Sequence, residues 1–146
     1  MMFINYIQLK LLKNRGRIMK IKIVSSKDEI ETIKNEEMVH FAFRLSNMDI
    51  FTLIKSCPKL RALHIPNSYK KTISKSTLMF LEMQNTGLLE GDVWGHRTDI
   101  AEYYEIKPQI FGRIDDLKNE GKSKEEIISK LGMETRLSED LIKFIV

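Results

Sequence analysis

The amino-acid sequence predicts an α/β fold, in which a small parallel sheet of about four strands with crossover helices precedes a C-terminal helical appendage of helix-turn-helix type. Two observations support this fold class. From residue 19 onward, β-rich runs alternate with stretches of helical periodicity, and a crossover helix between strands favours parallel pairing. Beyond Pro108, three short helix-period stretches follow one another without a further β-rich run.

The first strand-and-helix unit is IKIVSSKDEI, in which a strand begins near Met19 and a brief helix covers about 27–35. Ser26 and Glu29 stand at the spacing of a capping box. In that motif a side-chain oxygen accepts a hydrogen bond from an otherwise unpaired amide of the first helical turn. We therefore expect the helix to begin directly after Ser26.

The second unit, VHFAFRLSNMDI, begins with apolar residues at every second position, Val39, Phe41 and Phe43, which is the period that a strand requires. Ser46 and Asp49 repeat the capping spacing in a looser form. A helix over about 47–57 follows and ends before a proline. The apolar residues expected on its core side are Ile50, Phe51, Ile54 and Cys57.

The third unit, ALHIPNSYKKTI, predicts another strand and then a helix over about 72–85, with Gly87 as its C-terminal breaker. A fourth strand follows in LLEGDVW. Gly91 and Gly95 bracket the end of this strand and permit a positive φ or a close backbone approach. A further helix is expected at about 99–105.

The C-terminal part, residues 107–146, contains three short helix-period stretches with glycine turns, which resemble a helix-turn-helix unit. Ser123 and Glu126 form a capping pair at the start of the second stretch. The third stretch, in the place of a recognition helix, carries Glu139 and Asp140, and residues 107–146 hold eight basic and eight acidic side chains. Because phosphate contacts supply most nonspecific DNA affinity, two interpretations stay open: a helical packing or protein-interaction appendage, and a nucleic-acid reader.

The chain divides into three parts: residues 1–18, an α/β domain at 19–106 and a helical appendage at 107–146. Its 42% hydrophobic and 30% charged residues are typical of a globular protein. The formal net charge of +4 resides entirely in residues 1–18, on Lys10, Lys13, Arg15 and Arg17. Because Met19 opens a regular first strand, we interpret 1–18 as a non-native upstream extension or a disordered basic segment. The alternative is a basic amphipathic helix.

The sequence points to a cytoplasmic location without membrane association. No apolar run approaches the length of a membrane span, and the N-terminal charges follow the apolar stretch, the reverse of a secretory signal. Cys57 is the single cysteine, so the chain has no internal disulfide, as in a reducing compartment. We expect Cys57 to be a small buried packing residue.

Polar side chains gather where the predicted parallel strands end, and ligands of α/β proteins bind at that edge of the sheet. Residues 44–75 hold seven basic residues and one acid, whereas 76–106 hold six acids and one base. The sequence therefore predicts a site for a small anion or phosphorylated ligand, although the two stretches would also complement each other on the surface. The candidate ligand-binding residues are His64, Asn67, Ser68, Lys70, Lys71, Asp92, Trp94, His96 and Arg97.

The strand histidines, His40 and His64, are expected on the sheet face opposite their apolar neighbours, each with a local partner rather than a catalytic role. An acid–base role for His64 or His96 together with Asp92 is the enzymatic alternative, because imidazole titrates near neutral pH. The spacing of the histidines and Asp92 matches no compact metal motif, so we predict no metal site. No phosphate loop, dinucleotide fingerprint or nucleophile elbow identifies a cofactor or a reaction.

Three long runs, FAFRLSNMDIF, CPKLRALHIPNSYKKTISKS and LLEGDVWGHRTDI, resemble an archaeal family of unknown function found mainly in methanogens. The resemblance covers about residues 19–105. It implies an archaeal, cytoplasmic protein and agrees with Met19 as the start, but it implies no activity. The leading interpretation is thus a binding or regulatory module with a small anionic ligand or a protein partner. The alternatives are a nucleic-acid-binding regulator acting through the C-terminal helices and a small enzyme.

Overall fold

The computed structural model describes residues 19–92 and 103–146, and its centre is a five-stranded, mostly parallel sheet within those residues. The strand order is β4-β3-β2-β1-β5, with β1 to β4 parallel to their neighbours and β5 antiparallel to β1. The strands are β1 (Met19–Val24), β2 (Met38–Phe41), β3 (Ala62–Ile65), β4 (Gly87–Glu90) and β5 (Tyr103–Ile106). The predicted parallel α/β sheet is confirmed, and β5 is an addition to it.

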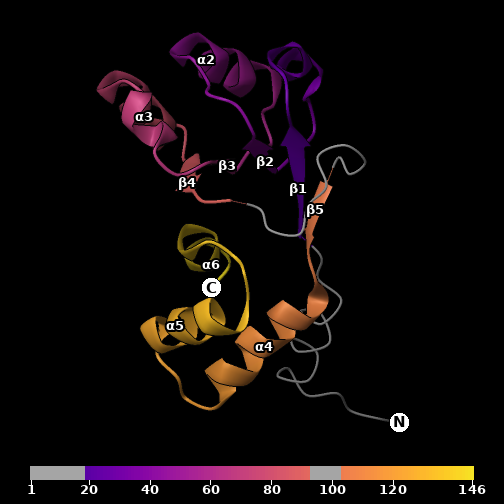
Figure 1. Cartoon of the computed structure of the whole chain (residues 1–146), viewed down its shortest axis with the longest axis vertical. Coiled ribbons are helices and arrows are strands. Elements are labelled where there is room, and N and C mark those ends of the chain that lie inside the picture. Colours follow the sequence, from indigo (N-terminus) through magenta and orange to yellow (C-terminus); the bar gives the residue numbers. More distant parts are fainter. Residues whose placement is uncertain (1–18, 93–102) are drawn as a thin grey trace.

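Helices cover both faces of the sheet (Figure 1). The helices between the parallel strands are η1 (Lys27–Thr32), α2 (Asn47–Ser56), η2 (Tyr69–Thr72) and α3 (Lys75–Met83). The predicted C-terminal helices are α4 (Pro108–Asn119), α5 (Lys124–Glu134) and α6 (Glu139–Ile145). In Figure 1, α2 and α3 lie above the strands, and α4 to α6 lie below them. None of the helices within 19–92 and 103–146 has the length and hydropathy of a membrane span.

The alternation of side chains along β2 and β3 creates two hydrophobic cores, one on each face of the sheet. Val39 and Leu63 are fully buried and belong to the core that α2, α3 and η1 complete. Met38 and Ala62 point the other way, into a core shared with α4, α5 and α6. The C-terminal helices therefore pack on the sheet as a second covering layer.

Local capping explains where α2 begins and ends. The Ser46 hydroxyl accepts from the Asp49 amide at 3.1 Å, and the Asp49 carboxylate accepts from the Ser46 amide at 2.9 Å, so the predicted cap is a complete capping box. The helix stops at Ser56, and Cys57 is 1% exposed, which confirms its predicted role as a packing residue. Burial raises the pKa of the Cys57 thiol, which disfavours the reactive thiolate.

Two helices of the first three units differ from their predicted form. The first is a 3-10 helix over Lys27–Thr32, shorter than expected, because Ser26 makes no side-chain cap hydrogen bond and Ile33 is extended. The third is a short 3-10 turn, η2, followed by α3, which begins at Lys75 because Ser74 caps it. Its end is made by Asn85 (φ 55°) rather than by Gly87, which already belongs to β4.

The predicted helix at about 99–105 is wrong for residues 103–105, which belong to β5; residues 99–102 lie outside the described residues. β5 pairs with β1 so that Tyr103 lies opposite Lys22 and Ile106 opposite Met19. Tyr103 and Tyr104 are aromatic, and aromatic residues favour strands. β5 also pairs with the backbone N–H and C=O groups along the edge of β1, which a helix in this place would leave without partners.

Candidate nucleic-acid interface

A pair of buried histidines lies on the face of the sheet that the C-terminal helices cover. His40 on β2 and His64 on β3 are register partners, and their Nδ1 atoms lie 2.7 Å apart. The ring centroids are 4.9 Å apart, and the side chains are 4% and 0% exposed. Two Nδ1 atoms at this distance share one proton, so one ring donates and the other accepts. The expectation that each strand histidine has a local partner is confirmed.

The second ring nitrogen of His64 joins the sheet to α6. His64 Nε2 lies 3.0 Å from the Ser138 hydroxyl, and the same hydroxyl caps α6 by accepting from the Leu141 amide at 3.3 Å. Two residues further along, the Asp140 carboxylate accepts a hydrogen bond of 2.8 Å from the Glu90 amide at the end of β4. The first turn of α6 is therefore bonded to two neighbouring strands.

Gly91 permits this close approach. A Cβ placed on Gly91 would lie 2.1 Å from Ser138 Cβ and 3.3 Å from His64 Nε2, and its φ of +149° also favours glycine. We refer to the set of residues His64, Glu90, Gly91, Ser138 and Asp140 as the α6–sheet contact. Figure 1 shows α6 below β3 and β4.

Burial determines the charge of His64. Removal of the ring from water lowers its pKa from 6.5 to about 4, and the nearby Asp140 carboxylate only partly opposes this change. The groups facing His64 are His40 on β2, Ser138 at the cap of α6, Asp140 on α6, and the backbone of Gly91 after β4. His64 is therefore neutral at neutral pH while α6 is docked.

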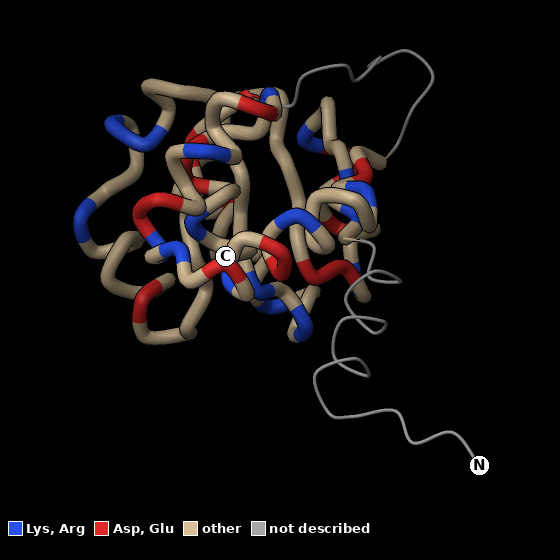
Figure 2. The backbone as a smooth tube through the Cα atoms, turned by 90° about the horizontal axis from the view of Figure 1, so that it is seen from below, with Lys and Arg blue, Asp and Glu red and all other residues tan. Residues whose placement is uncertain are grey.

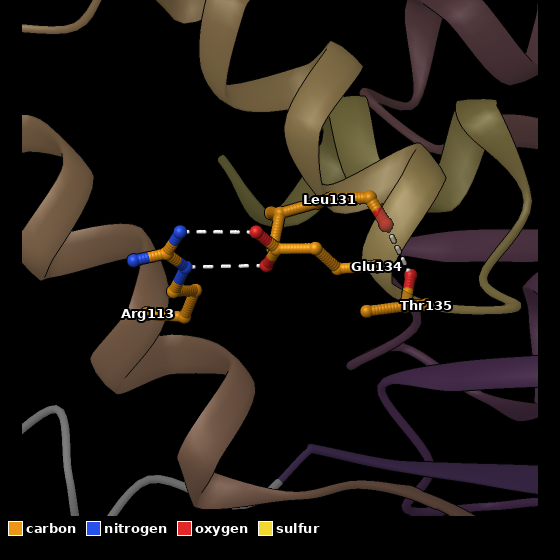
Figure 3. A network of polar contacts seen from close by, with 4 residues as sticks. All are labelled: Arg113, Leu131, Glu134 and Thr135. Atoms are coloured by element: carbon orange, nitrogen blue, oxygen red, sulfur yellow. Dashed lines mark hydrogen bonds and ion pairs between the residues drawn. The ribbon is translucent and has the colours of Figure 1, made fainter.

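The C-terminal helices form the helix-turn-helix arrangement that their sequence predicts. Arg113 on α4 donates two hydrogen bonds to the Glu134 carboxylate, at 3.1 and 2.9 Å, which ties α4 to the end of α5 (Figure 3). This bond raises the pKa of Arg113 and lowers that of Glu134. Thr135 then ends α5 by donating to the Leu131 carbonyl at 2.6 Å (Figure 3).

The turn between α5 and α6 contains residues 135–138, with Leu137 buried beneath it and Ser138 as the cap of α6. Ser138 stands where helix-turn-helix units usually place an apolar residue. The structure explains this departure, because Ser138 is hydrogen-bonded to the sheet instead of packing within the helical layer.

The outward surface of α5, the turn and α6 carries charges of both signs. Lys124 and Arg136 are exposed, and Lys143 forms an ion pair of 3.2 Å with Glu139 one turn earlier. A groove of about 570 Å³ runs between α5 and α6, lined by Glu125 and Lys143 among others. Seen from below, basic and acidic residues are interspersed along the described backbone (Figure 2).

The structure separates the predicted ligand residues into groups. Asn67, Ser68, Lys70 and Lys71 form an exposed turn after β3, in which Ser68 has a φ of 77°. His64, in contrast, directs its two ring nitrogens to His40 and Ser138 and offers neither to a ligand. Asp92 is exposed just after β4, whereas the remaining predicted residues, Trp94, His96 and Arg97, lie outside the described residues. The ligand site at the sheet edge stays a prediction.

Sequence reasoning missed the contribution of Ser138 and Asp140 to the α6–sheet contact. The only signals were an unexpected serine in a helix-turn-helix pattern and two histidines on one face of the sheet. Ser138 and His64 are 74 residues apart in the chain, so neither signal identifies the other.

Comparison with protein families gives two matches. Residues 20–102 match a model described as the N-terminal domain of a family of unknown function, DUF1699. Residues 109–146 match a model described as the C-terminal HTH domain of the same family. Neither a search of curated proteins nor a search of solved structures found a match.

Proposed function

Because this chain belongs to the DUF1699 family, whose C-terminal domain is a helix-turn-helix domain, we propose that it is a regulator that binds nucleic acid through α4, α5 and α6. The family itself has no assigned function, so the proposal rests on the helix-turn-helix match together with the geometry of these three helices. We place this activity in an archaeal cytoplasm, following the sequence resemblance and the single buried Cys57.

One observation carries the proposal: a helix-turn-helix match coincides with three helices whose second and third members are joined by a short turn and separately capped. Ser123 accepts from the Glu126 amide at 3.2 Å, and Ser138 caps α6. In such units the start of the second helix meets the phosphate backbone, and the third helix enters the major groove. Lys124 and Arg136 are exposed at the start of α5 and in the turn, where phosphates would lie.

The charge of the helices sets the expected strength of binding. Residues 107–146 carry as many acids as bases, so the net field contributes little and only a few individual cations contact phosphates. With two or three such contacts, the logarithm of the association constant should fall with the logarithm of salt concentration with a slope of about −2 to −3. Nonspecific binding should be weak and detectable at low salt.

Fluorescence anisotropy with a labelled duplex of mixed sequence tests the proposal over a series of salt concentrations. We expect salt-dependent binding that weakens at least several-fold in the double variant Lys124→Gln with Arg136→Gln. The matched control replaces two exposed lysines of the α/β part, Lys34→Gln with Lys59→Gln, and removes the same charge. Absence of salt-dependent binding at low salt, or an equal loss in both double variants, would contradict nucleic-acid binding through these helices.

A further inference from the structure

Most of the surface of α6 is already occupied in this structure. Leu141, Ile142 and Ile145 are buried in the core beneath the sheet. Phe144 packs under Arg61, whose guanidinium lies 5.2 Å from the ring centroid.

The α6 residues that point to solvent bond to each other. The side chains of Glu139 and Lys143 are 73% and 54% exposed, and they form the ion pair described above. As docked, α6 therefore presents one neutralised pair of side chains to solvent.

The docked end of α6 is the end that a recognition helix uses. The first residues of such a helix reach the base edges in the major groove. Here Ser138 is bonded to His64, and Asp140 accepts from the Glu90 amide, while the absence of a side chain at Gly91 lets the strand and the helix lie in close contact. In the first turn Glu139 is exposed, whereas the Ser138 hydroxyl and one Asp140 carboxylate oxygen are bonded to the sheet and are not offered to a duplex.

We propose that the α6–sheet contact is autoinhibitory: the N-terminal sheet holds the recognition helix in a docked state, and full DNA binding requires α6 to leave the sheet. This inference rests on the proposed function, because it concerns the same helices. Lys124 and Arg136 stay exposed in the docked state, so the docked protein retains weak backbone binding. Undocking adds the contacts of α6 and raises the affinity.

Gly91→Ala is the most direct test, because the new Cβ would overlap Ser138 and displace α6 without changing any α6 side chain. Gly121→Ala is the matched control, since Gly121 also has a positive φ of +83° but has nothing within 4 Å of an added Cβ. Both substitutions strain the backbone, because both glycines have a positive φ. Only Gly91→Ala places a new side-chain atom between the sheet and α6. Hydrogen–deuterium exchange of the α6 amides reports undocking, and anisotropy with the mixed-sequence duplex reports binding.

In Gly91→Ala we expect faster exchange in α6 together with DNA binding that is about tenfold tighter, a coupling of ordinary size, and neither change in Gly121→Ala. Faster α6 exchange with unchanged or weaker DNA binding would overturn autoinhibition while leaving nucleic-acid binding intact. Unchanged hydrogen exchange of the α6 amides would also overturn autoinhibition, because it would show that the α6–sheet contact does not hold the helix in place. If the wild-type protein shows no salt-dependent binding at all, the proposed function fails and this inference fails with it.

A second variant keeps the test decisive if Gly91→Ala does not fold, as judged by circular dichroism. His64→Leu with Asp140→Ala removes both hydrogen-bonded links and leaves Gly91 unchanged. The same pair of measurements and the same criteria apply to it.

Discussion

The stability of the fold should depend on pH through His64. Its pKa is about 4 in the folded protein and 6.5 when the ring is free in water, so the unfolded chain binds a proton first as the pH falls. Whenever the unfolded state holds more protons, acidification lowers the free energy of unfolding. The stabilising contribution is therefore complete above about pH 7 and is lost between about pH 6.5 and pH 4.

The loss in the free energy of unfolding can be calculated from the lowered pKa of His64. A depression from 6.5 to about 4 corresponds at 1.36 kcal/mol per pKa unit to about 3 kcal/mol once the pH is below about 4. At about pH 5 the unfolded ring is mostly protonated and the folded ring is mostly neutral, so about 2 kcal/mol should already be lost. This loss is a substantial part of the stability of an ordinary domain.

Urea denaturation of the wild-type protein and of His64→Leu, at about pH 7.5 and about pH 5, measures this loss. The leucine variant cannot titrate at this position, and His40 is present in both proteins. We expect the wild-type protein to lose about 2 kcal/mol more than the variant between the two pH values. Parallel losses in the two proteins would refute the reasoning that the docked helix keeps His64 dry and neutral.

Three further variants test separate features. Ser46→Ala removes the capping box of α2 and should lower the free energy of unfolding by about 1 kcal/mol in urea denaturation, whereas exposed Ser25→Ala should change it little. Asp115→Leu should raise the urea midpoint, because among the described residues Asp115 Oδ2 is buried without a hydrogen-bond partner; a lower midpoint would indicate that this carboxylate is needed. If the turn after β3 binds anions as proposed from the sequence, phosphate should raise the melting temperature of the wild-type protein and not of Lys70→Ala with Lys71→Ala. An equal rise in both proteins would count against that site.

The parallel part of the sheet could be predicted because its information is local. Val39 and Phe41 alternate with Met38 and His40, and this period fixes both the strand and the two faces before any partner is known. The caps at Ser46 and Ser123 work in the same way, because each hydroxyl bonds an amide three residues away. Strand periodicity and helix caps depend on residues within a few positions of each other and on no residue far away in the sequence.

The α6–sheet contact could not be predicted, because its partners come together only when the whole fold is assembled. The sequence around Ser138 predicts only a helix cap, and the sequence around His64 predicts only a strand residue among small neighbours. Their hydrogen bond depends on the C-terminal helices covering the face of the sheet opposite α2 and α3, and on Gly91 leaving room for α6. β5 could not be predicted for a related reason. It pairs with the edge of β1, which lies about eighty residues earlier in the chain, so the sequence around Tyr103–Ile106 does not reveal its partner.

The antiparallel strand β5 matters for the choice of fragment boundaries when the N-terminal part is expressed on its own. The two family matches end at residue 102 and begin again at residue 109, so the segment Tyr103–Ile106 belongs to neither. A fragment cut at the family boundary would leave the backbone of Met19–Lys22 without its neighbour, and a bare strand of this kind recruits other chains. Such a fragment would also lose α4, α5 and α6, which cover Met38 and Ala62 on one face of the sheet, so it should aggregate through both the bare edge and the uncovered face. A chain that keeps residues 103–146 retains both coverings.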